Sequence, residues 1–551
     1  MKSLQMLVYV CWVALSPLAT LHAQEKKIVG KGIDPATVAA YEKIGARYGG
    51  FEHVGIGIGY HFRPGQEAAE KWWPGFRFEN EPKKRLLDAN VLFALQFQPM
   101  TDAGLKHLAG LKHLSVLDLT VTDVTDAGLN DLAGLENLSA LDLSAKQVKG
   151  PGLKHLAGLK YLTSLDLGDT PMRDAGLKEL ASLKNLASLG LRDTKVTDVG
   201  LKELASLKNL TKISLFRTQV TDGGLKELAG LKNLVSLGLG HTHVTDLGLK
   251  QLEGLKNLAE LELNSTRVTD AGLNSLANLA GLSSLDLRGT KLRGIGLGQL
   301  ALLRNFTGLS LDNTELIDAG LGEIAGLTKL SRLYLSNTKV TDAGLKHLAG
   351  LKNLSELGLD STQLTDAGLM HFAGLTNLSW LGLESTRVTD AGLKQLADLT
   401  NLSRIRLNST QVSDAGLKQL ADHTRLTALA LDSTRVTDAG LKELAGLKNL
   451  SGLYLSRTKV TDTGLKELAG LKNLSRLELT DTQVTDKGLK ELAGLKELST
   501  LELGGSQVTD AGLKELAGLK NLAWLFLNRT RVTDAGQAEL GKSLPNCRII
   551  R

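Results

Sequence analysis

The sequence has little cysteine, few aromatic residues and only one long apolar run. Two of its 551 residues are cysteines, and one of them, Cys11, lies in the apolar stretch at the N-terminus. A chain without that stretch would keep Cys547 alone, which excludes an intrachain disulfide framework. The formal net charge of +6 is small for this length. The fold must therefore be held together by packing and hydrogen bonds.

What the chain has in abundance is one repeated signature. An Asp-x-Gly pattern recurs every 24 residues from Asp102/Gly104 to Asp534/Gly536, giving 19 slots. Glycine fills all 19 of its slots and aspartate fills 17, with Gly150 and Gly294 in the remaining two. A fixed period between 20 and 50 residues is typical of a solenoid. The sequence thus predicts one long stacked array.

Each 24-residue unit combines a strand pattern with a helix pattern. In residues 474–497, the run from Leu477 to Leu479 alternates as a strand does, with leucines inward. The run from Leu489 to Leu495 has helical spacing, and Asp486 before it is predicted to be the N-cap. One strand and one short helix cannot bury both apolar faces alone. Neighbouring coils must therefore cover the apolar faces that remain exposed.

The pattern LxxLxLxxT-x-V-T-D-x-G-L-x-x-L-A-x-L-x-N resembles the leucine-rich repeat, over roughly residues 90–551. This resemblance implies an α/β solenoid, a leucine-rich-repeat horseshoe of about 19 coils of 24 residues. Its concave face would be a parallel sheet, and its convex face would carry short helices. The chain is most similar to bacterial secreted multi-repeat proteins with internalin-like architecture. It is more distantly similar to the cysteine-containing repeats of F-box proteins, but no F-box-like module precedes the repeats.

Three repeated residues are interpreted as structural. Where the family usually has Asn or Cys, 16 of 18 coils have Thr, the exceptions being Lys146 and Ser506. A column of Thr hydroxyls can satisfy backbone groups of the loops. The repeated Asp fits an N-cap better than a calcium ladder, because the Gly-Gly-x-Gly-x-Asp nonapeptide is absent. The repeated Gly permits either a close approach of coils or an unusual backbone angle, and both remain open.

The chain is predicted to have four parts. Residues 1–23 resemble a secretory signal peptide, with Lys2, an apolar run and Ala23 before Gln24. Ser16-Pro17 interrupts that run before it reaches the length of a membrane helix, and no second apolar span follows. Residues 24–89 are an aromatic-rich capping segment, 90–545 the repeat array and 546–551 a C-terminal cap strand. We therefore expect an exported chain, periplasmic or at the cell surface, without a transmembrane segment after processing.

The segment before the repeats has its own composition. Residues 41–97 hold 11 of the aromatic side chains of the chain. Asp34-Pro35 predicts a helix start and Gly49-Gly50 its end, residues 51–62 are strand-like, and Trp72 to Phe76 predicts a tight aromatic turn. We interpret the segment as the cap of the first coil, with a small ligand-binding module as the alternative. Its Gly55 to Gly59 stretch lacks the residues that a phosphate-binding loop needs.

The strongest candidate for partner binding is a group of side chains in the outward strand slots of the concave sheet. An outward Trp flanked by Tyr and Arg is typical of interface hot spots. The alternative is an incidental stacking of Arg on Trp that only keeps the face soluble. The candidates are Arg332, Tyr334, Glu356, Trp380, Glu384, Arg404 and Arg406.

Three further groups are weaker candidates. Asp118, Asp142 and Asp166 share one outward column, which we interpret as a solvated acidic surface, with a site for a cation or basic partner as the alternative. Near the C-terminal end, Tyr454, Arg476, Trp524 and Phe526 form a second aromatic group that a terminal cap could cover. The convex lysines, such as Lys202 and Lys442, alternate with Glu and are expected to form a solvated helix face.

These observations favour a non-enzymatic scaffold that binds a protein through its concave face. An envelope glycan is the alternative partner, and nucleic acid is not expected. No cofactor, metal site or catalytic group is predicted, because His241/His243 and His347/His371 lack metal-site geometry and no catalytic triad is apparent. The competing hypothesis is a structural spacer or assembly unit of the envelope without a specific ligand. The sequence gives no indication of the oligomeric state.

Overall fold

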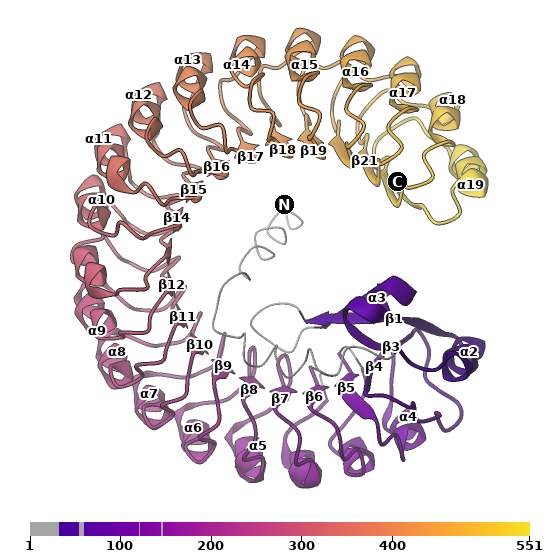
Figure 1. Cartoon of the computed structure of the whole chain (residues 1–551), viewed down its shortest axis with the longest axis vertical. Coiled ribbons are helices and arrows are strands. Elements are labelled where there is room, and N and C mark those ends of the chain that lie inside the picture. The colour runs from indigo at the N-terminus through magenta and orange to yellow at the C-terminus, as the bar shows by residue number, and fades with distance from the viewer. Residues whose placement is uncertain (1–31, 54–59, 121, 145–146) are drawn as a thin grey trace. The chain divides into compact units, whose positions relative to one another are not determined.

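The computed structural model describes residues 32–53, 60–120, 122–144 and 147–551. The predicted signal peptide and the Gly55 to Gly59 stretch lie outside these residues. The chain divides into two compact units, Met1–Leu285 and Asp286–Arg551. In each unit, strands line the inner side of a curved stack of coils and helices line the outer side (Figure 1). The predicted leucine-rich-repeat solenoid is therefore confirmed.

The first unit begins with a small module and continues with repeats. The module consists of α2 (Pro35–Lys43), β1 (Ala46–His53), β2 (Tyr60–Pro64), α3 (Gln66–Lys71) and β3 (Trp73–Phe78). The repeat strands are β4 (Phe93–Phe97), β5 (Leu114–Asp118), β6 (Ala140–Asp142), β7 (Ser164–Asp166), β8 (Ser188–Gly190), β9 (Lys212–Ser214), β10 (Ser236–Gly238) and β11 (Glu260–Glu262), and β12 (Ser284–Asp286) spans the boundary between the units. The outer layer comprises α4 (Asp102–Leu105), η2 (Lys106–Leu108), η3 (Gly128–Leu132), η4 (Pro151–Gly158), α5 (Asp174–Lys178), η5 (Glu179–Ser182), α6 (Asp198–Leu204), α7 (Asp222–Leu228), α8 (Asp246–Leu252), η6 (Asp270–Gly272) and α9 (Leu273–Ala277).

The second unit is built of repeats alone. Its strands are β13 (Gly308–Ser310), β14 (Arg332–Tyr334), β15 (Glu356–Gly358), β16 (Trp380–Gly382), β17 (Arg404–Arg406), β18 (Ala428–Ala430), β19 (Gly452–Tyr454), β20 (Arg476–Glu478), β21 (Thr500–Glu502), β22 (Trp524–Phe526) and β23 (Arg548–Ile550). Its helices are η7 (Leu297–Leu302), α10 (Asp318–Ile324), α11 (Asp342–Leu345), η8 (Lys346–Gly350), α12 (Asp366–Leu369), η9 (Met370–Phe372), α13 (Asp390–Leu393), η10 (Lys394–Leu396), α14 (Asp414–Lys418), α15 (Asp438–Leu444), α16 (Asp462–Leu468), α17 (Asp486–Leu492), α18 (Asp510–Leu513), η11 (Lys514–Leu516) and α19 (Asp534–Ser543). Neighbouring strands from β13 to β23 all pair in parallel, with each residue opposite the one 24 positions later.

Leucines fill the space between the strand layer and the helix layer. In the coil of residues 474–497, Leu477 and Leu479 from the strand side and Leu489 and Leu492 from the helix side are all fully buried. This pattern is repeated in coil after coil, as the sequence predicts. Each buried leucine stabilises the fold by about 1.5–3 kcal/mol relative to an exposed one.

The repeated Asp is not the N-cap that the sequence predicts. The cap of α17 is Thr485, which has extended backbone angles and accepts a hydrogen bond from the Lys487 N–H. Asp486, the first helical residue, instead holds the next coil, because its carboxylate accepts from the Thr509 N–H (2.7 Å) and hydroxyl (2.6 Å). Corresponding pairs of bonds join Asp438 to Thr461 and many other coils. The Asp column therefore acts as a series of clamps between coils.

The repeated Gly makes room for that clamp. A Cβ on Gly464 would lie 2.4 Å from Oδ1 of Asp438 in the preceding coil, far inside van der Waals contact. Apart from Gly296, which has a φ of +94°, the repeated glycines have no positive φ, so the structure selects close approach over unusual angles in the other coils. The two slots that lack Asp differ: Gly150 and Gly294 have φ of +120° and +93°, which glycine tolerates best.

The Thr column has the structural role that the sequence predicts. Each hydroxyl donates to the carbonyl of the leucine three residues earlier, as in Thr482 to Leu479 (2.7 Å), and all of these threonines except Thr530 are buried. The bond lies within one coil, so it fixes the turn after the strand. Asn side chains supply a further link between coils, as in Asn473 Nδ2 to the Lys448 carbonyl (2.9 Å).

The module before the repeats departs from the prediction at two places. Helix α2 starts after Asp34, as predicted, but ends at Lys43, and Gly49-Gly50 lie within strand β1. Residues Trp73 to Phe78 form strand β3 and not a turn, because β3 pairs with β1 on one side and β4 on the other. Gly75 permits this, since a Cβ there would lie 2.1 Å from the Ala94 carbonyl oxygen.

Candidate functional site

The candidate residues lie together on the inner sheet of the second unit. Parallel pairing places Arg332, Glu356, Trp380 and Arg404 directly opposite one another on β14, β15, β16 and β17. The same register puts Tyr334 and Arg406 in the neighbouring outward column, separated by two glycines. Glu384 follows β16 in the next slot. All seven side chains are half-buried.

Trp380 packs on its neighbours within this face. Its ring meets Tyr334 edge-on, with centroids 5.8 Å apart, and lies over Gly358 on the intervening strand. The Tyr334 hydroxyl donates to the Glu356 carboxylate. An edge-to-face aromatic pair contributes about 0.5–1.5 kcal/mol beyond its buried area. The cluster is therefore a preorganised aromatic surface with one polar edge.

Arg406 is the centre of a separate ionic cluster. Its guanidinium donates to Glu384 and lies 3.2 Å from Oδ2 of Asp360. Asp360 also accepts from the Glu384 backbone N–H (2.7 Å). Burial raises the pKa of Asp360, and the nearby Arg406 opposes that shift. Arg406 thus neutralises two carboxylates of the sheet, which gives it a structural role besides any contact with a partner.

Sequence reasoning missed an acidic column beside the candidates. Asp312, Asp360 and Asp432 occupy the slot two residues after the strand, and each accepts a backbone N–H of the next coil. Burial raises the pKa of Asp312 and of Asp432 to about 6. The recurrence of Asp at this spacing is the sequence pattern that could have predicted the column.

The second aromatic group, near the C-terminal end, consists of two separate sets of contacts. Arg476 lies over the Tyr454 ring at 5.8 Å and pairs with Glu478 (2.6 Å) and Glu502 (2.8 Å). Burial, followed by the charge of Glu478, raises the pKa of Glu502 to about 7. Further on, Trp524 stacks with Phe526, and Arg548 of the last strand covers the Trp524 ring at 5.1 Å. Strand β23 therefore covers this end only in part, since Trp524 remains 39% exposed.

The acidic column of the first unit is not the solvated surface that the sequence predicts. Asp118 and Asp142 are buried, and both lie in register with Asp166 on neighbouring strands. Gln96 donates to Asp118 (2.6 Å), and each carboxylate also accepts the backbone N–H two residues later. Burial, then Asp166 and Asp118, raise the pKa of Asp142 to about 7. The column is thus an internal polar ladder of the sheet.

The module before the repeats covers the inner face of the first coils. Phe51 and Phe62 are buried in one cluster with Ala94, Val116 and Ala140, which occupy one outward column of β4, β5 and β6. Tyr60 and Trp73 pack against this cluster. The small apolar residues in these slots match the aromatic cover. This stretch of sheet is therefore closed to a partner.

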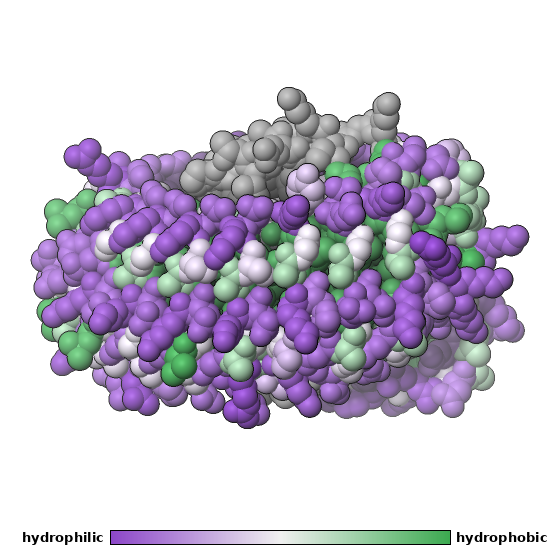
Figure 2. All heavy atoms as spheres, turned by 90° about the horizontal axis from the view of Figure 1, so that it is seen from below, coloured by the Kyte–Doolittle hydropathy of each residue, from purple (hydrophilic) through white to green (hydrophobic). Residues whose placement is uncertain are grey.

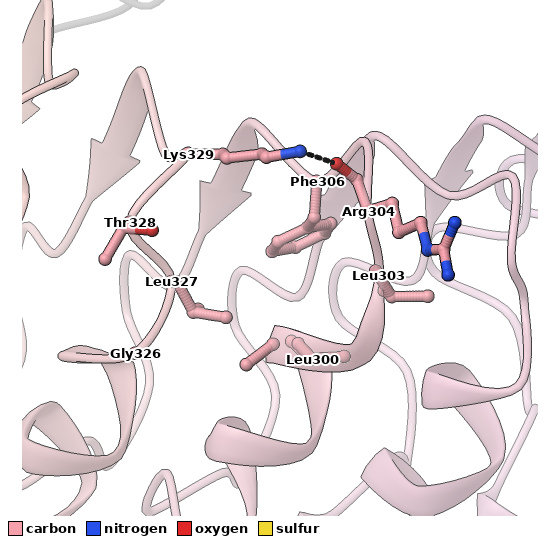
Figure 3. A pocket seen from close by; sticks show the side chains of 9 residues that line it. Leu300, Leu303, Arg304, Phe306, Gly326, Leu327, Thr328 and Lys329 are labelled. Atoms are coloured by element: carbon pink, nitrogen blue, oxygen red, sulfur yellow. Dashed lines mark hydrogen bonds between the residues drawn. The ribbon is translucent and has the colours of Figure 1, made fainter.

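A shallow pocket lies on the outer part of the second unit. It has a volume of about 180 Å³ and lies between two coils, next to η7 (Figure 3). Lys329 replaces the usual Asn there and donates to the Arg304 carbonyl (2.7 Å). Phe306 replaces the usual Leu and is buried. The pocket is thus a gap that results from two irregular residues in the repeat.

The outer helices form a solvated face. Figure 2 shows hydrophilic side chains in parallel rows, with pale and apolar residues between them. Lys202 and Lys442 are exposed. Within the described residues, no three His, Cys, Asp or Glu side chains are grouped so that they could hold a metal ion. No helix in this part of the chain is both long and apolar enough to cross a bilayer.

Comparison with known proteins supports the class that these coils define. A family model described as Leucine Rich repeat matches residues 158–181 and 470–493. The 24-residue coils of strand and helix give the chain the leucine-rich-repeat fold. Among solved structures, the chain is similar to two internalins of Listeria monocytogenes. Among curated proteins, no sequence matches the chain.

Three solved structures illustrate the likeness. An internalin of Listeria monocytogenes, inlF, is 24% identical over 68% of this chain and 93% of its own, with a TM-score of 0.39. A leucine-rich-repeat protein of Leptospira interrogans is 24% identical over 86% of this chain and 97% of its own, with a TM-score of 0.35. TLR13, in a complex with ssRNA13, is 18% identical over 79% of this chain and 65% of its own, with a TM-score of 0.53. The fold is what these structures share with this chain.

Proposed function

We propose that this chain is a non-enzymatic scaffold of the cell envelope or surface that binds a protein through the inner face of its second unit. The observation that carries the proposal is the alignment of Arg332, Glu356, Trp380 and Arg404 across four adjacent strands. A preorganised Trp beside Tyr and Arg is typical of binding hot spots. The leucine-rich-repeat class, which serves as an interaction scaffold, gives further support.

A protein partner fits this face better than nucleic acid does. Nucleic-acid binding depends on neutralising phosphates with Lys and Arg. Here Arg406 is already paired with two carboxylates, and Arg476 with two more. An envelope glycan remains the alternative ligand, since aromatic and carboxylate groups can also hold a sugar.

The second candidate function is a structural spacer or assembly unit of the envelope. The clamps between coils favour it, because they recur in nearly every coil regardless of what the inner face carries. Such an array would stand without a ligand. The two functions differ in one respect: only a binder depends on Trp380 and Arg404.

The test is a pull-down of envelope proteins and glycans of the source cell with the purified chain and with Trp380→Ala/Arg404→Glu. Arg406 is left intact, because its loss would leave Asp360 and Glu384 facing each other without a cation. Trp524→Ala is the matched control, since it removes another inner-face tryptophan outside the candidate group. Circular dichroism checks that each variant is folded.

A partner that the native chain and Trp524→Ala capture, and that the double variant loses, would support the binding function. Equal capture by all three proteins would refute the chosen site. Absence of any partner would favour the spacer.

A further inference from the structure

Two rows of lysines lie in the loops that lead from the outer helices to the inner strands. These loops have the sequence A-G-L-K-N-L or a close variant, and lysine fills the fourth position in five consecutive coils of the first unit and four of the second. The first row is Lys160, Lys184, Lys208, Lys232 and Lys256, and the second row is Lys448, Lys472, Lys496 and Lys520. All nine side chains, named here the loop lysines, are exposed.

The fold does not require lysine at this position. Thr424 occupies it in the coil before Lys448, and threonine also occupies it in the two coils before that. The following Asn makes the same bond to the loop in both cases, from Asn449 to the Thr424 carbonyl and from Asn473 to the Lys448 carbonyl, each 2.9 Å long. The packing that explains the repeated Leu, Thr and Asp therefore does not explain the two runs of lysine.

The next coil holds these lysine side chains in a common orientation. Lys472 Nζ donates to the Gly494 carbonyl (3.3 Å), just after the outer helix of the following coil. The equivalent bond to the following coil is made in the second row by Lys448, Lys496 and Lys520, and in the first row by Lys208, Lys232 and Lys256. An ammonium group has three N–H donors, so two remain for a ligand or for water. Each row is thus an ordered line of cations.

The loops have an excess of positive charge that the neighbouring helices lack. One acidic residue occurs in the loops of the second row, Glu497, and one in those of the first row, Glu253. On the helices beside the second row, the lysine six residues before each loop lysine is followed by a glutamate, as Lys442 is by Glu443. Among the described residues, no loop lysine forms an ion pair with a carboxylate. The surplus of charge therefore lies along the loops.

The spacing of the coils sets the distance between neighbouring loop lysines. Strands of a sheet lie about 4.8 Å apart and packed helices about 8–10 Å apart, so groups in the loops between them recur roughly every 5–10 Å. Like charges at this distance repel one another. A bound polyanion removes that repulsion and releases its own counterions. A row one side chain wide suits a linear polymer with one negative charge for each repeating unit.

We propose that each row of loop lysines binds a linear phosphodiester polymer that carries no bases, such as a polyol phosphate. Nucleic acid fits less well, because proteins that bind single strands stack the bases on aromatic side chains, and Tyr161 is the one aromatic residue in these loops. A bilayer also fits less well, because the leucines of the loops are buried and leave no apolar side chain to enter it. The rows lie outside the inner sheet, so this inference goes beyond the proposed protein binding and does not depend on it.

Two variants with equal net charge test the proposal. The loop variant replaces all nine loop lysines by Thr, the residue that Thr424 shows to be compatible with the loop. The helix variant replaces the lysine six residues before each loop lysine by Gln, a good helix former. Both variants lose nine positive charges from the same coils. Circular dichroism checks that each is folded.

The probe is fluorescently labelled poly(glycerol phosphate), titrated by anisotropy against the full chain and both variants at several salt concentrations. We expect the loop variant to lose at least tenfold in affinity and the helix variant to change less than threefold. The slope of log affinity against log salt should become shallower by about 3 in the loop variant, because four or five phosphate contacts are lost. Equal losses in the two variants would overturn the inference, as would the absence of binding by the native chain.

A variant of the second row alone covers the case in which the ninefold loop variant does not fold. We expect Lys448, Lys472, Lys496 and Lys520 changed to Thr to halve the number of polymer chains bound at saturation, and an unchanged number would overturn the inference.

Two further ligands separate the proposed partner from other anionic surfaces. They are an oligodeoxythymidylate with the same number of phosphates and vesicles that contain phosphatidylglycerol. Tighter binding of either ligand than of poly(glycerol phosphate) would overturn the proposal in favour of nucleic acid or of a membrane. The pull-down with Trp380→Ala/Arg404→Glu is independent of these results, because that variant keeps every loop lysine.

Discussion

At the scale of single residues, the repeat depends on an Asp that acts across coils and not within its own helix. Thr and Asp are both good N-caps, so the sequence could not separate them when they stand side by side. The deciding partner, the Thr of the following coil, lies 23 residues away. A local reading of the sequence has no access to that contact. Such a reading selects the right residue but assigns it a hydrogen bond within its own helix, and not the bond to the following coil.

Replacing Asp438 by Ala should lower the free energy of unfolding by about 2–3 kcal/mol, because two hydrogen bonds to a carboxylate are lost. The measurement is chemical denaturation of the single variants and of a double-mutant cycle with Thr461→Val. We expect a coupling energy near 1 kcal/mol or more between Asp438 and Thr461. An Asp that served only as an N-cap would show no coupling with Thr461.

Gly464 is predicted to be intolerant of any side chain because of the same carboxylate. Gly464→Ala places a methyl group 2.4 Å from Oδ1 of Asp438, and we expect a loss of about 1–3 kcal/mol. Combining it with Asp438→Ala should cost less than the sum of the two changes, since the clash disappears. Gly446→Ala is the control: a Cβ there meets nothing within 4 Å. A similar loss at both glycines would contradict the close-approach explanation.

At the scale of secondary-structure elements, the periodic pattern predicted strands and helices well, and the module before the repeats poorly. The leucine spacing is set by burial between two layers, which each coil repeats. The Trp72 to Phe76 segment has turn-forming Pro and Gly, yet β3 forms because it joins β1 to the first repeat strand. That pairing involves residues distant in sequence. Tertiary context thus overrode the local signal.

The turns after the strands contain a second feature without a sequence signal. Ser409, Ser433 and Arg457 have φ between +55° and +58°, where most side chains are strained. Each donates its N–H to the next coil, as Ser409 does to the Asp432 carbonyl (2.7 Å). The bond between coils holds the backbone in this conformation. Residue type at the slot varies, so the sequence could not indicate it.

The sequence could predict where the candidate residues lie on the sheet, but not which side chains they pair with. The period alone placed Trp380 beside Arg404 and Glu356, because parallel strands align equivalent slots. The period could not show that Arg406 forms ion pairs with Asp360 and Glu384, or that Asp118 and Asp142 are buried. Side-chain rotamers, and whether a surface is buried, depend on atoms from several coils at once.

The buried acidic ladder of β5 to β7 should make stability depend on pH. The pKa of Asp142 is about 7 in the folded state against an ordinary value of 3.8, so the folded chain binds more protons between these values. Stability should therefore fall as pH rises from about 4 through 7. Asp142→Asn removes the charge and keeps an acceptor for the Ser144 N–H. We expect it to raise the unfolding midpoint at pH 8 and to have little effect at pH 4.

Thermal denaturation of the native chain and Asp142→Asn over this pH range tests the prediction. Asp486→Asn is a suitable comparison, since it alters an Asp that lies outside the ladder. A stabilisation by Asp142→Asn that is equal at pH 4 and pH 8 would show that the carboxylate does not titrate as the structure indicates.

At the scale of the whole chain, stability is expected to be a sum of similar nearest-neighbour terms. Coils are joined by the same Asp, Asn and backbone bonds at a fixed interval of 24 residues. Deletion of residues 438–461 should therefore leave a folded chain, because Asp414 still meets Thr437 and Asp462 still meets Thr485. Deletion of residues 438–449 should unfold the surrounding coils. Circular dichroism and denaturation of both deletions check this.

The aromatic cover over β4 to β6 has a consequence for how such a chain can evolve. Phe51 and Phe62 occupy a fixed length of sheet, whatever the number of coils that follow. Each tandem duplication of one coil therefore adds its full width to the accessible face, while the covered part stays constant. Unequal recombination between near-identical coils would lengthen or shorten the accessible face in steps of one coil. The module that covers β4 to β6 would not change. Selection could then act on the size of the recognised target before it acts on any single side chain.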